Sequence, residues 1–271
     1  MPSPASSGRQ PDLVARLRAA GCVFAEDEAR LLSSAARTPA ELEELTGRRT
    51  AGEPLEHVLG WAEFSGLRIA VDPGVFVPRR RTEFLVRQAI ELAAGRAGTS
   101  AEPTVVVDLC CGSGALGVAV ATALRGTVEL HGADIDPAAV RCARRTIGAA
   151  GGQVHTGDLF EALPSALRGR VDILLANVPY VPSEAVELMP PEARDHEPRV
   201  ALDGGADGLD VLRRVAGAAP VWLAPGGHLL VEASERQVPD ATRAFTAGGL
   251  VPRVATCEER EATVVIGTKR Q

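Results

Sequence analysis

The chain of 271 residues has an ordinary globular composition, with 45% hydrophobic and 24% charged residues. Its formal net charge of −6 argues against a nucleic-acid-binding protein, because such proteins usually carry a basic surface. No apolar run reaches the ~18 residues that a membrane span needs, and the N-terminus lacks the apolar core of an export signal. We therefore expect a cytoplasmic protein that acts without a membrane or a nucleic acid as its direct partner.

The N-terminal part of the chain predicts a small helical domain over residues 11–72. Residues 1–10 are rich in Ser and Pro and are expected to form a disordered lead-in. Apolar residues then recur at helical spacing, and Thr38 followed by Pro39 is typical of a helix start. The glycines within residues 47–52 are expected to end the helical pattern.

A connecting region over residues 73–103 is predicted to follow a β-hairpin or bent strand at residues 61–71. This connection contains a helical pattern over residues 82–94 and then a linker rich in Gly, Ala and Ser. From Thr104 onward, apolar runs of strand length alternate with helical patterns, which predicts a parallel sheet with helices on both faces. We therefore assign residues 104–271 to one α/β domain.

A short apolar run at residues 104–109 leads into a glycine-rich turn and then into a helical pattern. The match to G-x-G-x-x-G is weak evidence alone, because the chain contains 28 glycines. Between a strand and a helix, however, such a turn lets the backbone approach a nucleotide-like ligand and directs helix N–H groups at it. The residues predicted to bind this ligand are Asp108, Cys110, Cys111, Gly112, Ser113 and Gly114.

The next two predicted strands each end near an acidic side chain. Asp134 follows the strand over residues 128–133, about 20 residues after the glycine-rich turn, where an acid can accept hydrogen bonds from ribose hydroxyls. Asp136 precedes a proline and has the chemistry of a helix N-cap, so we assign the ribose to Asp134. Asp158 and Leu159 follow the next strand and are candidates for contact with an adenine ring, with a simple surface turn as the alternative.

The apolar run that ends in Asn177, Val178, Pro179 and Tyr180 is the most informative segment of the chain. The Asn177 side chain offers one carbonyl acceptor and one amide donor, and Pro179 restricts Val178 to extended geometry. Tyr180 adds a flat aromatic ring. A polar acceptor, a fixed carbonyl and an aromatic ring at the end of a strand suit a planar amide or amine substrate. A proline turn that merely stops the strand is the alternative interpretation.

The C-terminal third continues the alternation of helices and strands. It predicts a helix over residues 209–218, a turn over residues 222–227 and a strand over residues 228–233. Two terminal strands, at residues 250–256 and 263–268, are joined by a short turn. Such a connection implies that one strand of the sheet is antiparallel to its neighbours.

The five cysteines predict neither a disulfide framework nor a metal site. Cys110 and Cys111 are adjacent and cannot form an ordinary structural disulfide. The chain contains no C-x-x-C pair and no Cys/His cluster with the spacing of a zinc site. We therefore expect reduced thiols and no bound metal.

Four motifs in order carry a resemblance to a known family. They are D-L-x-x-G-S-G from Asp108, A-D-I-D-P from Ala133, G-D-L-F from Gly157 and N-V-P-Y from Asn177. Together they resemble the PrmC/HemK family of class I S-adenosylmethionine-dependent methyltransferases, which methylate a glutamine of peptide chain release factors. The segments 54–64, 76–83 and 197–202 also resemble this family, so that the resemblance extends from about residue 54 to the C-terminus.

The resemblance implies a Rossmann-like, mostly parallel sheet with helices on both faces, a C-terminal antiparallel strand and a small N-terminal helical domain. It implies an enzyme that uses S-adenosyl-L-methionine to methylate a glutamine side-chain amide in the Gly-Gly-Gln loop of a release factor. Asn177 Oδ1 and the Val178 carbonyl would each accept one N–H of that amide and orient its nitrogen. The residues implied in acceptor binding are Asn177, Val178, Pro179, Tyr180, Arg79 and Glu197.

Several departures from the family pattern mark this chain as a divergent member. Val178 stands where the family usually has proline, Cys110 replaces a glycine, and Leu159 stands where tryptophan is frequent. Arg80 and Arg81 replace a proline and an aspartate. Because some of these departures concern the acceptor, a small-molecule N-methyltransferase stays an alternative. A nucleic-acid amino-methyltransferase and a non-catalytic binding protein are two further alternatives.

Overall fold

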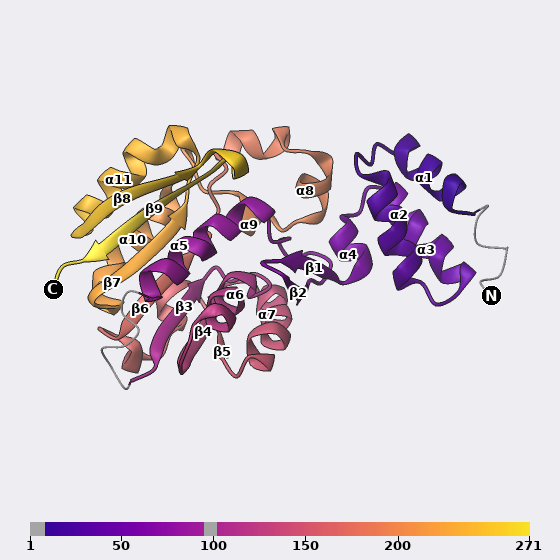
Figure 1. The fold of residues 1–271 in the computed structure, drawn as a ribbon. Coiled ribbons are helices and arrows are strands. Elements are labelled where there is room, and N and C mark those ends of the chain that lie inside the picture. Colours follow the sequence, from indigo (N-terminus) through magenta and orange to yellow (C-terminus); the bar gives the residue numbers. More distant parts are fainter. Residues whose placement is uncertain (1–8, 95–101) are drawn as a thin grey trace.

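The computed structural model describes residues 9–94 and 102–271. Most of the predicted lead-in and most of the predicted Gly/Ala/Ser linker lie outside these described residues. A small helical unit lies at one end of the molecule and a larger α/β body at the other (Figure 1). The hairpin of β1 (Trp61–Phe64) and β2 (Leu67–Ala70) lies between them, where the sequence predicts a hairpin.

The helical unit buries a small core of its own, centred on Leu17 and Leu32. Thr38 caps its third helix, because its side chain accepts a hydrogen bond from the Glu41 N–H, as the sequence predicts. The unit consists of α1 (Arg9–Ala19), α2 (Ala25–Ala35), α3 (Pro39–Thr50) and α4 (Leu55–Leu59).

The helical pattern ends within residues 47–52, as predicted, although α3 continues through Gly47 to Thr50. The reason is a tertiary contact that outweighs the low helix propensity of glycine. Arg49 lies in the last turn of α3, and its Nε donates to Glu28 Oε2 over 2.7 Å in a buried ion pair.

The α/β body contains a seven-stranded sheet with the order β5-β4-β3-β6-β7-β9-β8. β9 runs antiparallel to both β7 and β8, and the other neighbouring pairs are parallel. This topology confirms the predicted fold with its single antiparallel strand. The strands are β3 (Thr104–Leu109), β4 (Val128–Asp134), β5 (Gln153–Thr156), β6 (Val171–Ala176), β7 (Leu223–Glu232), β8 (Leu250–Cys257) and β9 (Ala262–Lys269).

Helices cover both faces of this sheet, and each face has its own core. In β3, Val106 contributes to one core, while Val105 and Val107 contribute to the other. A strand that is buried on both faces is apolar at nearly every position, which explains the apolar runs in the sequence. The helices of the body are α5 (Glu83–Ala94), α6 (Ala115–Ala123), α7 (Pro137–Ala149), α8 (Pro191–His196), α9 (Arg199–Leu202), α10 (Asp210–Trp222) and α11 (Val238–Ala247).

The predicted turn over residues 222–227 is wrong, because β7 begins at Leu223. The pairing of β6 with β7 contains a register shift, from Val171 opposite Leu223 to Ile173 opposite His228. This irregularity accommodates the proline and glycines of the segment inside the strand. A Cβ at Gly227 would lie 2.6 Å from the Val171 carbonyl oxygen, so that only glycine allows this approach.

The register of the sheet brings the predicted ligand-binding segments to one edge. Leu109 is paired with both Ala133 and Ala176, the residues at or next to the ends of β4 and β6. The segments that follow these three strands therefore begin side by side at the carboxyl edge, where ligands bind in open α/β sheets. No helix in the described part of the chain is long and apolar enough to cross a membrane.

Candidate active site

Asp134 connects the glycine-rich turn to the start of the next helix. Its Oδ2 accepts from the Gly112 N–H over 2.9 Å, and its Oδ1 accepts from the Asp136 N–H over 2.9 Å. Burial raises the pKa of Asp134 above its ordinary value, although these two N–H groups oppose the rise. A carboxylate offers about four lone pairs, so that Asp134 can still accept hydrogen bonds from ligand hydroxyls.

Asp136 has the role that its sequence context predicts. Its side chain accepts from the Ala138 N–H over 2.8 Å and caps α7, with Pro137 in the first turn of the helix. Asp136 is therefore used as a helix cap, whereas Asp134, at the end of β4, can still accept hydrogen bonds from a ligand.

The glycine-rich turn adopts left-handed backbone conformations at three positions. Gly112 has a φ of 54° and Gly114 a φ of 78°, values that glycine adopts freely. A Cβ at Gly114 would lie 2.7 Å from Ile147 Cγ1, whereas the space above Gly112 is open. Cys110, with a φ of 53°, also lies in this region, and a residue with a side chain pays roughly 1–2 kcal/mol for it.

Asp108 is fully buried below this turn and fixes the start of α6. Its Oδ2 accepts from the Gly117 N–H over 2.8 Å. Loss of solvation raises the pKa of Asp108 to about 8, against the lowering effect of the Gly117 N–H and with a smaller contribution from Asp134.

Asn177 carries the clearest chemical signal at this edge. Its Oδ1 is buried and has no hydrogen-bond partner among the described residues. Leaving a buried acceptor unpaired costs about 1–3 kcal/mol, and native structures seldom tolerate it without a reason. The position therefore calls for a hydrogen-bond donor that the described residues do not provide.

One cavity at the carboxyl edge brings together segments that are far apart in the sequence. It is lined by residues 75, 76, 78, 79 and 81, by residues that follow β3 and β4, and by the loop after β6. Ten of the residues predicted to bind donor or acceptor line this cavity: Arg79, Cys110, Cys111, Gly112, Ser113, Asp134, Asn177, Val178, Pro179 and Tyr180.

The other five predicted residues lie outside the lining of this cavity. Asp108 is buried below the turn, and Gly114, within the turn, packs against Ile147 and Ala143 of α7. Asp158 forms an ion pair with Arg214 over 2.6 Å, and Leu159 packs against the core of one sheet face. The Glu197 side chain is only 1% exposed.

Glu197 holds the segment that forms one wall of the cavity. It accepts from the Val77 N–H over 3.1 Å and from Arg79 Nη2 over 2.7 Å. Burial raises the pKa of Glu197, while the Arg79 charge and the Val77 N–H act in the opposite direction. Glu197 therefore holds the Arg79 side chain in position from the buried side of the cavity wall.

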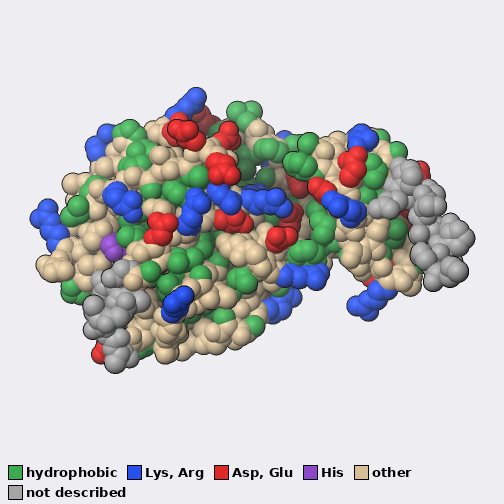
Figure 2. All heavy atoms as spheres, viewed as in Figure 1, with side chains coloured by type: hydrophobic (Ala, Val, Ile, Leu, Met, Phe, Trp, Pro, Cys, Tyr) green, Lys and Arg blue, Asp and Glu red, His purple; other side chains and the backbone are tan. Residues whose placement is uncertain are grey.

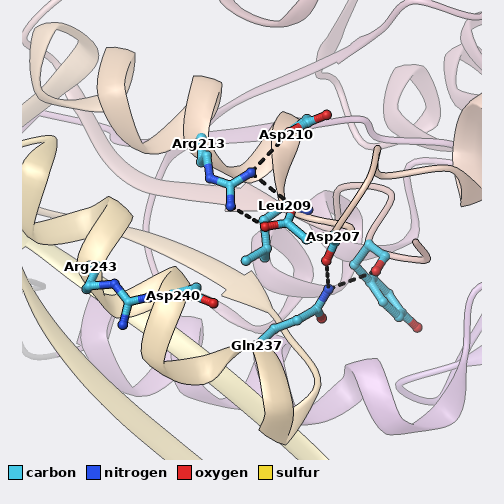
Figure 3. A network of polar contacts seen from close by, with 8 residues as sticks. Asp207, Leu209, Asp210, Arg213, Gln237, Asp240 and Arg243 are labelled. Atoms are coloured by element: carbon cyan, nitrogen blue, oxygen red, sulfur yellow. Dashed lines mark hydrogen bonds and ion pairs between the residues drawn. The ribbon is translucent and has the colours of Figure 1, made fainter. Parts of the chain in front are cut away.

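The backbone of Tyr180 is fixed by a residue that the sequence analysis did not single out. Gln237 Nε2 donates to the Tyr180 carbonyl over 2.9 Å. It also donates to the Asp207 carbonyl over 3.2 Å (Figure 3). Gln237 also forms a capping box with Ser234. This S-x-x-Q spacing was the one available signal, and it indicates a helix start without revealing the contact with Tyr180.

Glycines of the neighbouring loop pack tightly against the same segment. A Cβ at Gly208 would lie 2.2 Å from the Tyr180 carbonyl oxygen, and one at Gly204 would lie 2.6 Å from the Pro179 carbonyl oxygen. Gly208 also has a left-handed φ of 77°. The loop after β6 is therefore held in place by backbone packing as well as by hydrogen bonds.

The helical unit meets the α/β body through charged side chains. Arg49, which pairs with Glu28 inside the unit, also lies 3.6 Å from Glu192 of α8. Acidic and basic side chains are visible along this junction in the space-filling view (Figure 2).

The sheet and the position of its cavity define a class I methyltransferase. The sequence model of the Methyltransferase small domain matches residues 67–190. Among solved structures, the Thermus thermophilus 16S rRNA N2 G1207 methyltransferase RsmC, in complex with AdoMet and guanosine, superposes with a TM-score of 0.54 at 23% identity, over 78% of this chain and 50% of that chain. This likeness concerns the fold alone.

Two curated relatives are more similar to this chain in sequence. A release factor glutamine methyltransferase of Streptomyces coelicolor is 41% identical over 217 residues, which are 80% of this chain and 72% of the relative. A 4-amino-L-phenylalanine/4-methylamino-L-phenylalanine methyltransferase of Streptomyces pristinaespiralis is 39% identical over 204 residues, or 74% of this chain and 68% of the relative. The chain belongs to the release factor glutamine methyltransferase family that its motifs resemble.

Proposed function

We propose that this protein transfers a methyl group from S-adenosyl-L-methionine to a glutamine side-chain amide in the Gly-Gly-Gln loop of a peptide chain release factor. The observation that carries the proposal is the buried, unpaired Asn177 Oδ1 beside the cavity. An amide N–H of the acceptor is the donor that this oxygen lacks. The name of the 41% identical relative supports the same acceptor, and termination of translation would place the protein in the cytoplasm.

The residues around the turn are suited to S-adenosyl-L-methionine. Asp134 retains lone pairs for the ribose hydroxyls, and the open space above Gly112 lets a ligand lie against the backbone of residues 110–114. When bound, this group supplies a methyl carbon on a positively charged sulfur. The assignment of Asp158 and Leu159 to the adenine ring stays a prediction, because neither side chain lines the cavity.

The task of the acceptor loop follows from the chemistry of an amide. The amide nitrogen is a poor nucleophile because its lone pair is delocalised. Asn177 Oδ1 and the Val178 carbonyl would each accept one N–H, direct the lone pair toward the methyl carbon and stabilise the charge that develops on nitrogen. Tyr180 would hold the amide plane. Orientation of this kind contributes several kcal/mol to catalysis.

We assign the release-factor binding surface to the helical unit, which forms most of the predicted N-terminal domain of residues 11–72. It adjoins α8 through Arg49, and a protein loop needs a wider contact surface than a free metabolite does. Residues 73–103 would connect it to the methyltransferase domain of residues 104–271. The wall formed by residues 78–83 would then face Tyr180.

The decisive test is incubation of the protein with labelled S-adenosyl-L-methionine and a purified release factor, followed by mass spectrometry of the Gly-Gly-Gln peptide. We expect one added methyl group on the glutamine. A release factor with glutamate in place of this glutamine is the matched control and should remain unlabelled. Equal labelling of both proteins, or no labelling of either, would refute the proposed acceptor.

A free amino acid with an aromatic amine is the second candidate acceptor. The relative that is named for 4-amino-L-phenylalanine methylation is 39% identical, close to the 41% of the release factor methyltransferase. In addition, Arg81 brings a positive charge to the hydroxyl of Tyr180. Methylation of 4-amino-L-phenylalanine with an untouched release factor would favour this second candidate.

A further inference from the structure

A second cavity adjoins the first across the side chains of Arg81 and Tyr180, which line both. Its volume is about 580 Å³, and Glu232, the last residue of β7, forms part of its wall. This cavity has ample room for a small molecule, since one water takes up about 30 Å³ in the liquid. The proposed methylation chemistry uses none of the side chains on its far wall.

Glu232 is a buried acid whose hydrogen bonding is incomplete. Its side chain is 6% exposed, and its Oε1 accepts from Arg81 Nε over 2.8 Å. Its Oε2 is buried and has no partner among the described residues. A buried carboxylate oxygen without a donor is costly, so that this oxygen calls for an N–H group from outside the chain.

Arg81 presents unused donors next to this acid. Its guanidinium lies over the Tyr180 ring, 5.7 Å from the centroid, and its Nη2 donates to the Tyr180 hydroxyl. A guanidinium has five N–H groups, and the bonds to Tyr180 and Glu232 occupy two of them in the described structure. The Arg81 side chain is 44% exposed, which leaves the remaining donors accessible to a ligand.

We propose that Arg81 and Glu232 form a subsite for the head group of a free α-amino acid. The α-carboxylate would bind the unused N–H groups of Arg81, a geometry that guanidinium and carboxylate favour. The α-ammonium would donate to Glu232 Oε2. The side chain of the ligand then extends past Tyr180 into the first cavity, toward Asn177.

This subsite rests on the second candidate function and names the residues that would select its substrates. A glutamine inside a protein chain has neither a free α-carboxylate nor a free α-ammonium. It therefore gains no binding energy from Arg81 and Glu232. The rim of the cavity adds the exposed acids Glu235, Glu258 and Glu261 and the single base Arg236, an excess of negative charge that favours the ammonium end of the ligand.

The competing explanation is that Arg81 and Glu232 only hold the Tyr180 side chain in position. Such a positioning role would affect every acceptor equally, whereas a subsite discriminates by the charges of the ligand. Calorimetry of the full chain, saturated with S-adenosylhomocysteine, can separate the two. The probes are L-4-aminophenylalanine, its α-carboxamide, which lacks the carboxylate, and its N-acetyl derivative, which lacks the ammonium.

We expect the free amino acid to bind at least tenfold more tightly than either derivative. Arg81→Gln should weaken binding of the amino acid at least tenfold and binding of the carboxamide less than twofold. Glu232→Gln should weaken binding of the amino acid but not that of the N-acetyl derivative. Arg87→Gln is the matched control, because Arg87 is exposed and lines neither cavity.

Equal affinities for the three probes, or equal losses for all of them in Arg81→Gln, would overturn the subsite, as would absence of binding. Unchanged melting temperatures and S-adenosylhomocysteine affinities of the variants exclude unfolding as the cause. The result is distinguishable from failure of the candidate function. If the amino acid binds through its head group but is not methylated, the subsite stands and the second function falls.

Discussion

The glycine-rich turn and the loop after β6 lie at the ends of neighbouring strands, but they are held in different ways. In the turn, the fixing bonds are local: Asp108 and Gly117 are 9 residues apart, and Asp134 and Gly112 are 22 apart. The loop at Tyr180 depends on distant parts of the chain, since its partner Gln237 is 57 residues away and its partner Arg81 is 99 away.

This difference separates donor binding from acceptor recognition. A strand–turn–helix unit and the end of the neighbouring β4 organise the proposed donor side. The acceptor side is assembled from α5 and its preceding turn, the end of β7 and the start of α11. A change such as the arginine at position 81 can therefore alter acceptor recognition while the donor side stays intact. The predictions below test this separation.

The largest expected effect is that of Asn177→Ala on turnover. We expect methyl transfer to fall at least about 100-fold, because removal of one preorganised polar group from a reacting centre costs roughly 10²–10³ in rate. Affinity for S-adenosylmethionine, measured by calorimetry, should change less than about threefold, since the lost contact concerns the acceptor. A variant with near wild-type turnover would exclude Asn177 from the reaction.

Asp134→Ala should produce the opposite pattern. Loss of charge-assisted hydrogen bonds to the ribose is expected to weaken S-adenosylmethionine binding by about 1–3 kcal/mol. Asp136→Ala is the informative comparison, because loss of the helix cap should lower the free energy of unfolding by about 1 kcal/mol and change affinity less. If calorimetry shows equal affinity losses in the two variants, the assignment of the ribose to Asp134 fails.

Gly208→Ala tests whether packing behind Tyr180 controls the acceptor side alone. The new Cβ would lie 2.2 Å from the Tyr180 carbonyl oxygen, so the loop must shift. We expect turnover to fall roughly tenfold with little change in donor affinity, since a strained left-handed residue and a displaced loop each cost about 1–2 kcal/mol. Gly217→Ala, on the exposed side of α10 with open space around it, should be neutral in both measurements.

Much of the fold was predictable because its strands and helices are determined by local patterns. The apolar runs from Thr104 onward predict buried strands, and Thr38 and Asp136 predict helix starts that the structure confirms. The error at the start of β7 and the continuation of α3 through Gly47 have one cause. At both places a distant partner, Val171 or Glu28, determines the local conformation, and the local sequence carries no trace of it.

The candidate site shows the same division. The sequence motifs lead directly to the residues that line the donor side and to Asn177. Glu232, Gln237 and Gly208 were not predicted, because their importance comes from contacts with Tyr180 or Arg81 that only the fold creates. The cluster of arginines before α5 was visible in the sequence, but its contact with Tyr180 was not.

The pH dependence of stability tests the environment of Asp108, below the glycine-rich turn. Its pKa of about 8 lies far above the ~3.9 of an unfolded aspartate, so that the native state binds the extra proton between these values. Through this group, stability is greatest at low pH and falls by about 1.4 kcal/mol per pH unit as the pH rises toward 8. Asp108→Asn cannot titrate, and its free energy of unfolding should lack this contribution.

Denaturant unfolding of both proteins between pH 5.5 and 7 measures the difference directly. The free energy of unfolding of the wild-type protein should fall relative to that of Asp108→Asn as the pH rises, because only the wild-type protein loses the contribution of the protonated acid. Parallel curves would show that Asp108 has the same charge in the folded and unfolded chains across this range.

Val178→Pro should have the smallest effect. This substitution restores the residue that the family usually has, and within the described residues the Val178 N–H donates no hydrogen bond that proline would abolish. The carbonyl needed for the acceptor amide is preserved. The buried side chain contributes to one core, so that a small loss of packing below about 1.5 kcal/mol is expected. Turnover measured with the confirmed acceptor should stay within about twofold of wild type, and a tenfold loss would mean that this loop requires the conformation that valine permits and proline forbids.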